Sequence, residues 1–163
     1  MQTASIFYML GLAMWDDTIT VFNRYEASDG EILYYPTVIN GVDLIVDKAA
    51  AQATTGLADA DEARLHIPYT MQNGSIMVGG KKWLPPIAWA GQVNDDLSTS
   101  VTFDEGNDFF MLGEYLQTEE PISSDDYSRT GFLDYLRLTY DDVYLIASVG
   151  KYDLIPHFEI GGR

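Results

Sequence analysis

The sequence predicts a mainly β protein, built as a small β-barrel or sandwich of about eight short strands with one short α-helix and long loops. Three observations support this class. Short alternating or apolar runs are separated by turn residues, aromatic residues make up 13% of the chain, and a helical period occurs in one segment. The length of 163 residues fits one domain. We therefore expect an apolar arm at residues 1–16 and a single β-rich domain at residues 17–163.

The first part of the domain is predicted to form a strand, a turn and two further strands. Residues 17–25 (DTITVFNRY) alternate with the period of two that a half-buried strand requires. Residues 27–30 (ASDG) carry turn chemistry, and residues 32–35 would form the returning strand. Residues 37–47 then predict another strand, in which Asn40-Gly41 indicates a bulge or a tight turn.

The next part is predicted to alternate between loops and short strands. Residues 49–61 are small and polar, which favours a flexible loop over a weak helix. Residues 63–69 are extended, and Asn73-Gly74 predicts a hairpin that leads into a strand at residues 75–78. Residues 99–103 and 109–115 are then expected to pair with each other.

One helix is predicted, at residues 126–138. Ser123 could cap it, and Phe132 and Leu136 belong to an apolar stripe of helical period that would pack inward. Two final strands are predicted at residues 142–149 and 152–160.

The charge balance excludes several classes of partner. The chain has 25 acidic residues against nine Lys and Arg, a net charge of −16. Binding to nucleic acid relies on cationic contacts with phosphate, and an anionic membrane surface attracts the same contacts, so both partners are disfavoured. The acidity keeps the protein soluble, although it could also steer it toward a basic partner. The chain has no Cys, which excludes disulfides and thiolate metal sites.

No motif for a metal, a cofactor or catalysis has the residue spacing that its function requires. Residues 74–81 imitate a phosphate-binding loop, but an extra glycine intervenes and no hydroxyl follows the lysine. Residues 94–105 resemble a calcium loop, but Thr99 stands where the turn needs glycine. His66 and His157 share no metal-ligand spacing, and no serine lies in a nucleophile elbow. We therefore expect no cofactor, no metal and no enzymatic activity.

The segment WLPPIAW is the strongest candidate for binding a partner. Pro85-Pro86 excludes a helix interior or a central strand, so we expect a stiff, apolar loop. A stiff loop loses little entropy on docking, and tryptophan is common at the energetic centre of interfaces. The predicted partner-binding residues are Trp83, Leu84, Pro85, Pro86 and Trp89, together with Phe7 and Trp15 in the arm. The alternative is a loop folded over the mouth of the barrel.

The apolar run at residues 6–15 (IFYMLGLAMW) has three interpretations. It is too short to span a membrane and lacks the basic start of a secretory signal. It could dock on the core of its own domain, or insert against a neighbouring subunit. It could also precede the natural start, which would then be Met9 or Met14.

Four stretches of the chain resemble a family of small structural proteins of tailed phages. They are residues 19–45, 58–69, 102–115 and 141–163, which occur in this order and together cover about half of the chain. The chain departs from the family in its longer start and in having Gly106-Asn107 where Gly-Asp is frequent. The resemblance implies a small β-barrel with long loops, acting as a head-closure (stopper) or head–tail adaptor protein in a ring below the portal.

The resemblance also implies the partners and the location of the protein. The expected partners are copies of the chain in a ring, the portal or adaptor protein, and the tail-end protein. The expected location is the neck of the virion, after assembly in the host cytoplasm. A tail terminator or another minor capsid protein is an alternative. A rival from another class is a small-molecule or carbohydrate-binding barrel with Trp83 and Trp89 as stacking residues, and an enzyme is the third possibility.

Overall fold

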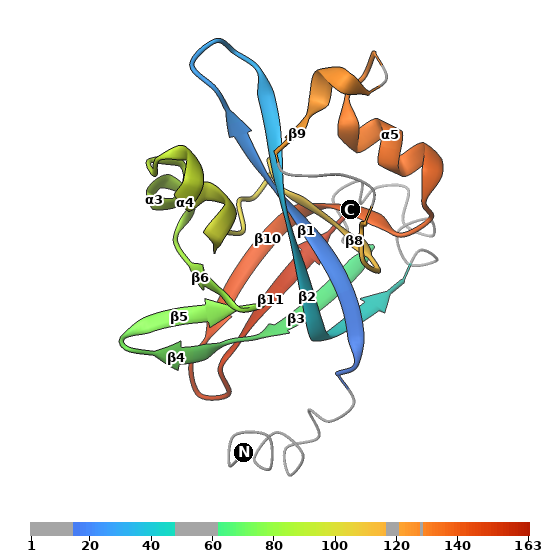
Figure 1. Ribbon diagram of the computed structural model, residues 1–163. Coiled ribbons are helices and arrows are strands. Elements are labelled where there is room, and N and C mark those ends of the chain that lie inside the picture. Colours follow the sequence, from blue (N-terminus) through green and yellow to red (C-terminus); the bar gives the residue numbers. More distant parts are fainter. Residues whose placement is uncertain (1–14, 48–61, 117–120, 128) are drawn as a thin grey trace.

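The computed structural model describes residues 15–47, 62–116, 121–127 and 129–163 of the chain. They form a closed six-stranded β-barrel with one extra strand, and a second, smaller sheet (Figure 1). This confirms the predicted fold class. Going round the barrel, the strands are β1 (Asp17–Glu26), β8 (Phe109–Leu112), β10 (Val143–Tyr152), β11 (His157–Gly162), β3 (Ala63–Pro68) and β2 (Ile32–Val46). The pairing of β2 with β1 closes the barrel, and β9 (Ile122–Ser123) adds to β2.

The smaller sheet and the helices lie in the connections between barrel strands. The sheet has the order β4 (Thr70–Gln72), β5 (Ser75–Val78), β6 (Lys81–Trp83) and β7 (Ser100–Val101). The helices are α3 (Pro86–Ala90), α4 (Asn94–Thr99), α5 (Phe132–Thr139) and the 3-10 turn η2 (Ser124–Asp126). The described residues thus hold three α-helices where one was predicted. The predicted loop at residues 49–61 and most of the predicted arm lie outside the described residues.

The predicted turns are confirmed. Gly30 has a φ of 88° in the turn between β1 and β2. The β1–β2 register shifts beside Gly41, which has a φ of 72° and forms the predicted bulge. Asn73 and Gly74 have φ values of 52° and 79°, as a two-residue hairpin turn between β4 and β5 requires.

The helix predicted at residues 126–138 is shorter than expected and begins later. It begins at Phe132, after Gly131 at a φ of 95°, so this glycine precedes the helix instead of interrupting it. Ser123 does not cap it, because its hydroxyl donates to a glutamate beside β2 (2.6 Å). Ser124 Oγ instead accepts the Phe132 N–H (3.1 Å). The inward packing predicted for Phe132 is confirmed, as its side chain is fully buried.

Two predicted strand arrangements are wrong. Residues 99–103 and 109–115 do not pair with each other: β7 pairs in parallel with β6, and β8 lies between β1 and β10. The last turn also lies further along than predicted, at residues 153–156. Gly150 does not make this turn, because it continues β10 in register with Glu159.

Two short helices replace the loop predicted around the proline pair. Pro86 is the first residue of α3, where its missing N–H costs no hydrogen bond. The proline pair therefore starts a helix. α4 begins after a short break, with Asp95 and Asp96 in its first turn, where carboxylates interact well with the helix dipole. Both helices are too short to show a helical period in the sequence.

The buried side chains form three clusters. The largest fills the barrel and includes Ile19, Leu65 and Ile160. A second lies between α5 and the barrel, where Leu136 is fully buried, and a third surrounds Trp89 beside α3 and α4. Together the clusters bury most of the aromatic rings that the composition provides.

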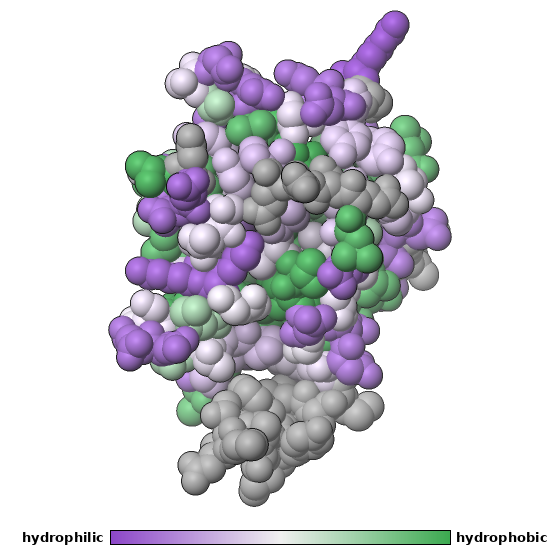
Figure 2. Space-filling view, in the orientation of Figure 1, coloured by the Kyte–Doolittle hydropathy of each residue, from purple (hydrophilic) through white to green (hydrophobic). Residues whose placement is uncertain are grey.

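The barrel has two different ends (Figure 1). We call the end that carries α3, α4 and α5 the helix end, and the end where the β4–β5 and β10–β11 hairpins project the hairpin end. On the face shown in Figure 2, hydrophobic residues form small patches between hydrophilic ones, and one patch lies over the middle of the barrel. Within the described residues, no helix is long and apolar enough to cross a membrane.

Candidate functional site

The predicted partner-binding segment WLPPIAW runs from the end of β6 through α3. Trp83 is half-buried, and its ring centroid lies 5.0 Å from that of Phe158 in the barrel core. Leu84 is half-buried and donates its N–H to a carbonyl of β7 (3.0 Å). Pro85 is exposed and Pro86 is half-buried. The segment is therefore anchored on both sides, and only part of it is free to meet a partner.

Trp89 belongs to the core. Its side chain is 1% exposed and packs edge-on against Tyr25 and Tyr35, with centroid distances of 6.4 and 5.9 Å. The indole ring thus offers no surface to a partner. Ile87, two residues earlier, points outward and is 91% exposed. Ile87 could not be predicted from the sequence, because its outward position follows only once a helix is known to begin at Pro86.

Two of the predicted partner-binding residues, Phe7 and Trp15, belong to the predicted arm. Phe7 lies outside the described residues. Trp15 stacks on His66 with a centroid distance of 5.4 Å and meets His157 edge-on at 5.9 Å. Its carbonyl oxygen lies 3.8 Å from the place that a Cβ on Gly41 would occupy. The chain therefore passes close to β2 at a residue without a side chain, and the arm joins the barrel there.

Both histidines belong to a row of aromatic rings on the outside of the barrel. The rings of His66 and His157 lie 5.9 Å apart, and Tyr152 stacks on His157 at 5.0 Å with an interplanar angle of 13°. The row crosses β3, β11 and the end of β10, so it can be recognised only when the register of these strands is known. It connects Trp15, where the arm begins, to the β10–β11 hairpin.

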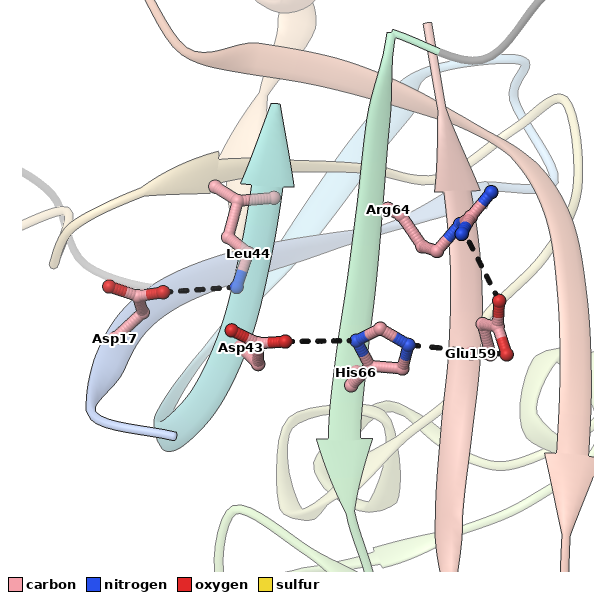
Figure 3. Close-up of polar contacts among 6 residues, drawn as sticks. All are labelled: Asp17, Asp43, Leu44, Arg64, His66 and Glu159. Atoms are coloured by element: carbon pink, nitrogen blue, oxygen red, sulfur yellow. Dashed lines mark hydrogen bonds and ion pairs between the residues drawn. The ribbon is translucent and has the colours of Figure 1, made fainter. Parts of the chain in front are cut away.

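Carboxylates flank His66 on both sides (Figure 3). Asp43 Oδ2 lies 3.2 Å from Nδ1, and Glu159 Oε2 lies 4.0 Å from Nε2. The three residues are register partners on β2, β3 and β11, so the sheet itself aligns them. Arg64 Nε completes the network at 3.6 Å from Glu159. Among the described residues, no group of three or more His, Asp or Glu is arranged to hold a metal ion. The network fixes the imidazole on which Trp15 stacks.

Three large apolar side chains are exposed on two adjacent hairpins at the hairpin end. Leu154 is 98% exposed, Met71 60% and Tyr152 50%. Tyr69 joins the two hairpins, because it precedes β4 and its hydroxyl donates to Asp153 in the β10–β11 turn. Single exposed apolar residues are ordinary on protein surfaces, but several on neighbouring loops form a candidate contact surface. We call Met71, Tyr152 and Leu154 the hairpin surface.

A buried carboxyl group lies elsewhere and serves the fold. Asp108 is 1% exposed and accepts hydrogen bonds from Arg24 N–H (2.8 Å), Asn23 Nδ2 (2.8 Å) and Asp104 N–H (2.9 Å). Burial raises the pKa of Asp108 to about 7, although these hydrogen bonds act in the opposite direction. Because the group is enclosed, it holds the loop before β8 against β1 and has no access to a substrate.

The fold and this surface define a class: a small closed β-barrel with projecting hairpins. A family model matches residues 14–163, so the chain belongs to that family, which is described as a family of unknown function, DUF6751. The match begins next to Trp15, the first residue of the aromatic row. Neither the curated proteins nor the solved structures gave a match.

Proposed function

We propose that the protein is a structural subunit of a tailed phage, a head-closure (stopper) or head–tail connector protein that forms a ring between portal and tail. The observation that carries the proposal is the hairpin surface, where Leu154 is 98% exposed and the Tyr152 ring stacks on His157, which Trp15 also contacts. Exposed apolar groups of this kind favour burial against another protein by about 25 cal/mol per Å². The resemblance of four stretches of the sequence to phage neck proteins points to the same role.

A ring needs two different surfaces on each subunit, because a head-to-tail contact joins unlike patches. The hairpin surface supplies one. The exposed residues Ile87 and Val93, at 91% and 71%, lie around α3 at the helix end and supply a candidate for the other. In such a ring, the helix end of one subunit would contact the hairpin end of the next, and neither barrel would need to change its fold.

The charge explains why assembly would need a partner. Like surfaces with a net charge of −16 repel one another in free solution. A portal or adaptor ring would supply the template, and a tail-end protein would bind the opposite side. In this proposal the protein has no catalytic activity or cofactor, assembles in the host cytoplasm and is found in the neck of the virion. A tail terminator or another minor capsid protein would use the same surfaces.

The test is co-sedimentation of the purified chain with a portal assembly from the same phage. The chain should be monomeric alone and sediment with the portal. The double variant Met71→Ser, Leu154→Ser should weaken binding at least about tenfold, since two apolar anchors are lost. Leu138→Ser is the matched control, because Leu138 is 84% exposed on α5, away from the hairpin surface. Absence of the protein from purified virions, together with no binding to the portal, would refute the proposal.

A second candidate function has one observation in its favour. A hollow of about 320 Å³ is lined by Trp83, Phe103, Asp104 and Glu105, among others. Trp83 Nε1 is buried and has no hydrogen-bond partner among the described residues. An aromatic ring beside carboxylates suits a sugar or another small polar ring, although the buried Trp89 cannot share in the stacking. Titration with mono- and oligosaccharides, followed by tryptophan fluorescence in the native chain and in Trp83→Phe, would separate this function from assembly.

A further inference from the structure

The hollow beside Trp83 combines aromatic rings with negative charge. It has a volume of about 320 Å³ and lies where the end of β6, the start of α3, β10 and the loop after β7 meet. Its lining residues are Trp83, Pro86, Phe103, Asp104, Glu105 and Val149. Ligand pockets in proteins begin at about 300 Å³, so the hollow suits one side chain or one small molecule.

The aromatic rings of the hollow are held in place by the barrel core. Trp83 and Phe103 each pack on Phe158, with centroid distances of 5.0 and 5.1 Å. Phe158 is fully buried, so neither ring can turn away without opening the core. The rings are therefore in place before a ligand binds, and the π face of an aromatic ring attracts cations.

The two carboxylates are also held in place, but no cation neutralises them. Asp104 Oδ2 accepts a hydrogen bond from Asn107 Nδ2 (2.9 Å), and Glu105 Oε1 accepts one from the Val149 N–H (3.0 Å). The second oxygen of each carboxylate accepts no hydrogen bond from the described residues, and no described Lys or Arg forms an ion pair with either group. A bound cation would therefore meet two free carboxylate oxygens.

We propose that this hollow binds the side chain of an arginine or a lysine of another protein. The cation would lie against the ring of Trp83 and pair with Asp104 and Glu105. Arginine fits best, because its planar guanidinium group can stack on an aromatic ring while its edge donates hydrogen bonds to carboxylates. A sugar stacks on aromatic rings too, but it is neutral and would leave both carboxylates without a counter-charge.

The charge balance of the chain favours a different protein as the source of the cation. The sequence has nine Lys and Arg against 25 acidic residues. Lys151, two residues beyond Val149 on β10, is already paired, with its Nζ 2.6 Å from Asp153. The net charge of −16 repels a second copy and attracts a basic partner. The inference requires only a basic protein partner, so it does not rest on the proposed place in a phage.

The first test is an NMR titration of the full-length chain with N-acetyl-arginine amide. The matched ligand is N-acetyl-citrulline amide, which has nearly the same shape and no charge. The arginine derivative should shift the Trp83 indole N–H and the Val149 amide in a saturable way, and the citrulline derivative should bind at least about tenfold more weakly. Equal binding of the two would overturn the proposal and favour a neutral ligand such as a sugar.

The second test removes the two charges of the hollow. The variant Asp104→Asn, Glu105→Gln keeps the shapes of both side chains and should bind the arginine derivative at least about fivefold more weakly than the native chain. The control Asp125→Asn, Asp126→Asn removes two exposed charges from η2, beside α5, and should bind it as the native chain does. Equal weakening in both would show a general attraction to an acidic surface and would overturn the site.

The third test concerns the ring of Trp83. Trp83→Phe keeps an aromatic ring, Trp83→Leu removes it, and both keep the two carboxylates. Trp83→Leu should bind the arginine derivative at least about threefold more weakly than Trp83→Phe, and equal binding would contradict the role of the ring. Amide spectra away from the hollow check that each variant is folded. These titrations contain no portal protein, so their failure and the failure of the co-sedimentation test are separate results.

Discussion

The two ends of the barrel differ in where their large aromatic side chains lie. At the helix end, α5 and α3 bury large aromatic rings, with Phe132 at 0% exposure and Trp89 at 1%. At the hairpin end, Met71 and Leu154 remain in solvent at 60% and 98%. The helix end uses its aromatic rings to complete the core and leaves aliphatic side chains such as Ile87 exposed, whereas at the hairpin end the aromatic ring of Tyr152 is itself half exposed.

This difference shows that residue type alone is a poor guide to an interface. Trp89 has the chemistry of an interface anchor and lies in the core, because α3 turns it toward Tyr25 and Tyr35. Leu154 has the chemistry of a core residue and lies at a hairpin tip. The direction in which a short element points its side chains decides between the two roles.

The largest expected difference between the two ends is in how far a substitution lowers the free energy of unfolding. Phe132→Ala should lower the free energy of unfolding by about 3–5 kcal/mol, because the cavity left between Phe22, Phe109 and Tyr115 is closed in. Leu154→Ala should change it by less than about 0.5 kcal/mol, as the side chain is already in water. Urea denaturation of both variants measures the difference, and similar losses would mean that the hairpin end is also part of the core.

The buried carboxyl group should make the stability of the protein depend on pH. The pKa of Asp108 is raised from 3.8 to about 7 in the folded state, so the folded chain binds this proton more tightly than the unfolded chain. Its contribution is therefore fully present below pH 3.8 and is lost as the pH rises toward 7. The stability of the native chain relative to Asp108→Asn should fall by on the order of 4 kcal/mol between pH 4 and pH 8, at 1.36 kcal/mol per pKa unit.

Asp153 at the hairpin end is the matched control. A hydrogen bond from Lys151 lowers the pKa of this exposed carboxyl below its ordinary value of 3.8, so its protonation does not change above pH 5. The stability of the native chain relative to Asp153→Asn should not vary with pH above 5. Urea denaturation at several pH values gives both comparisons, and a difference in stability between the native chain and Asp108→Asn that does not change with pH would contradict the raised pKa of Asp108.

Adding a single methyl group at either of two glycines should lower the stability by different amounts. A Cβ on Gly162 would lie 2.8 Å from Tyr144 Cβ, which the barrel holds in place, so Gly162→Ala should cost about 1–3 kcal/mol. A Cβ on Gly150 would lie 3.2 Å from the ring of Tyr152, which is half in solvent and can move. Gly150→Ala should therefore cost less than about 0.5 kcal/mol. Thermal melts of the two variants rank the effects, and the reverse order would contradict this account of the packing.

The smallest expected effect is that of added ligands. Thermal melts with EDTA, Mg²⁺ or ATP should coincide with the melt of the protein alone, because the phosphate-loop and calcium-loop spacings both fail. A ligand at 100 times its Kd would stabilise the fold by about 2.7 kcal/mol, which is several degrees for a domain of this size. A shift of that kind with any of the three would reveal a site that sequence spacing does not encode.

The sequence predicts the parts of this fold that depend on local chemistry. Alternation and turn residues locate β1, the Gly41 bulge and the Asn73-Gly74 turn, because each follows from the residues at that position. Pairing between distant segments is not local. β8 lies beside β1, where Asp108 accepts hydrogen bonds from Asn23 Nδ2 and Arg24 N–H, 85 and 84 residues away in the sequence, and no short pattern predicts this pairing.

The candidate site follows the same rule. Trp15 and Trp83 could be singled out because tryptophan is rare and often lies at interfaces, yet their surroundings could not be predicted. The row from Trp15 through His66 and His157 to Tyr152 is assembled by the register of three strands.

The closed barrel also separates the residues that fold the chain from those that would meet other proteins. Its strands pair all the way round, so substitutions on the β4–β5 and β10–β11 hairpins leave the ladder of hydrogen bonds intact. Relatives of this protein can therefore change the residues at the hairpin tips, while the packing of the core restricts change among the inward-facing residues. Divergence among relatives should be concentrated at Met71, at Leu154 and in the turns that carry them, and the barrel would persist as an unchanging frame.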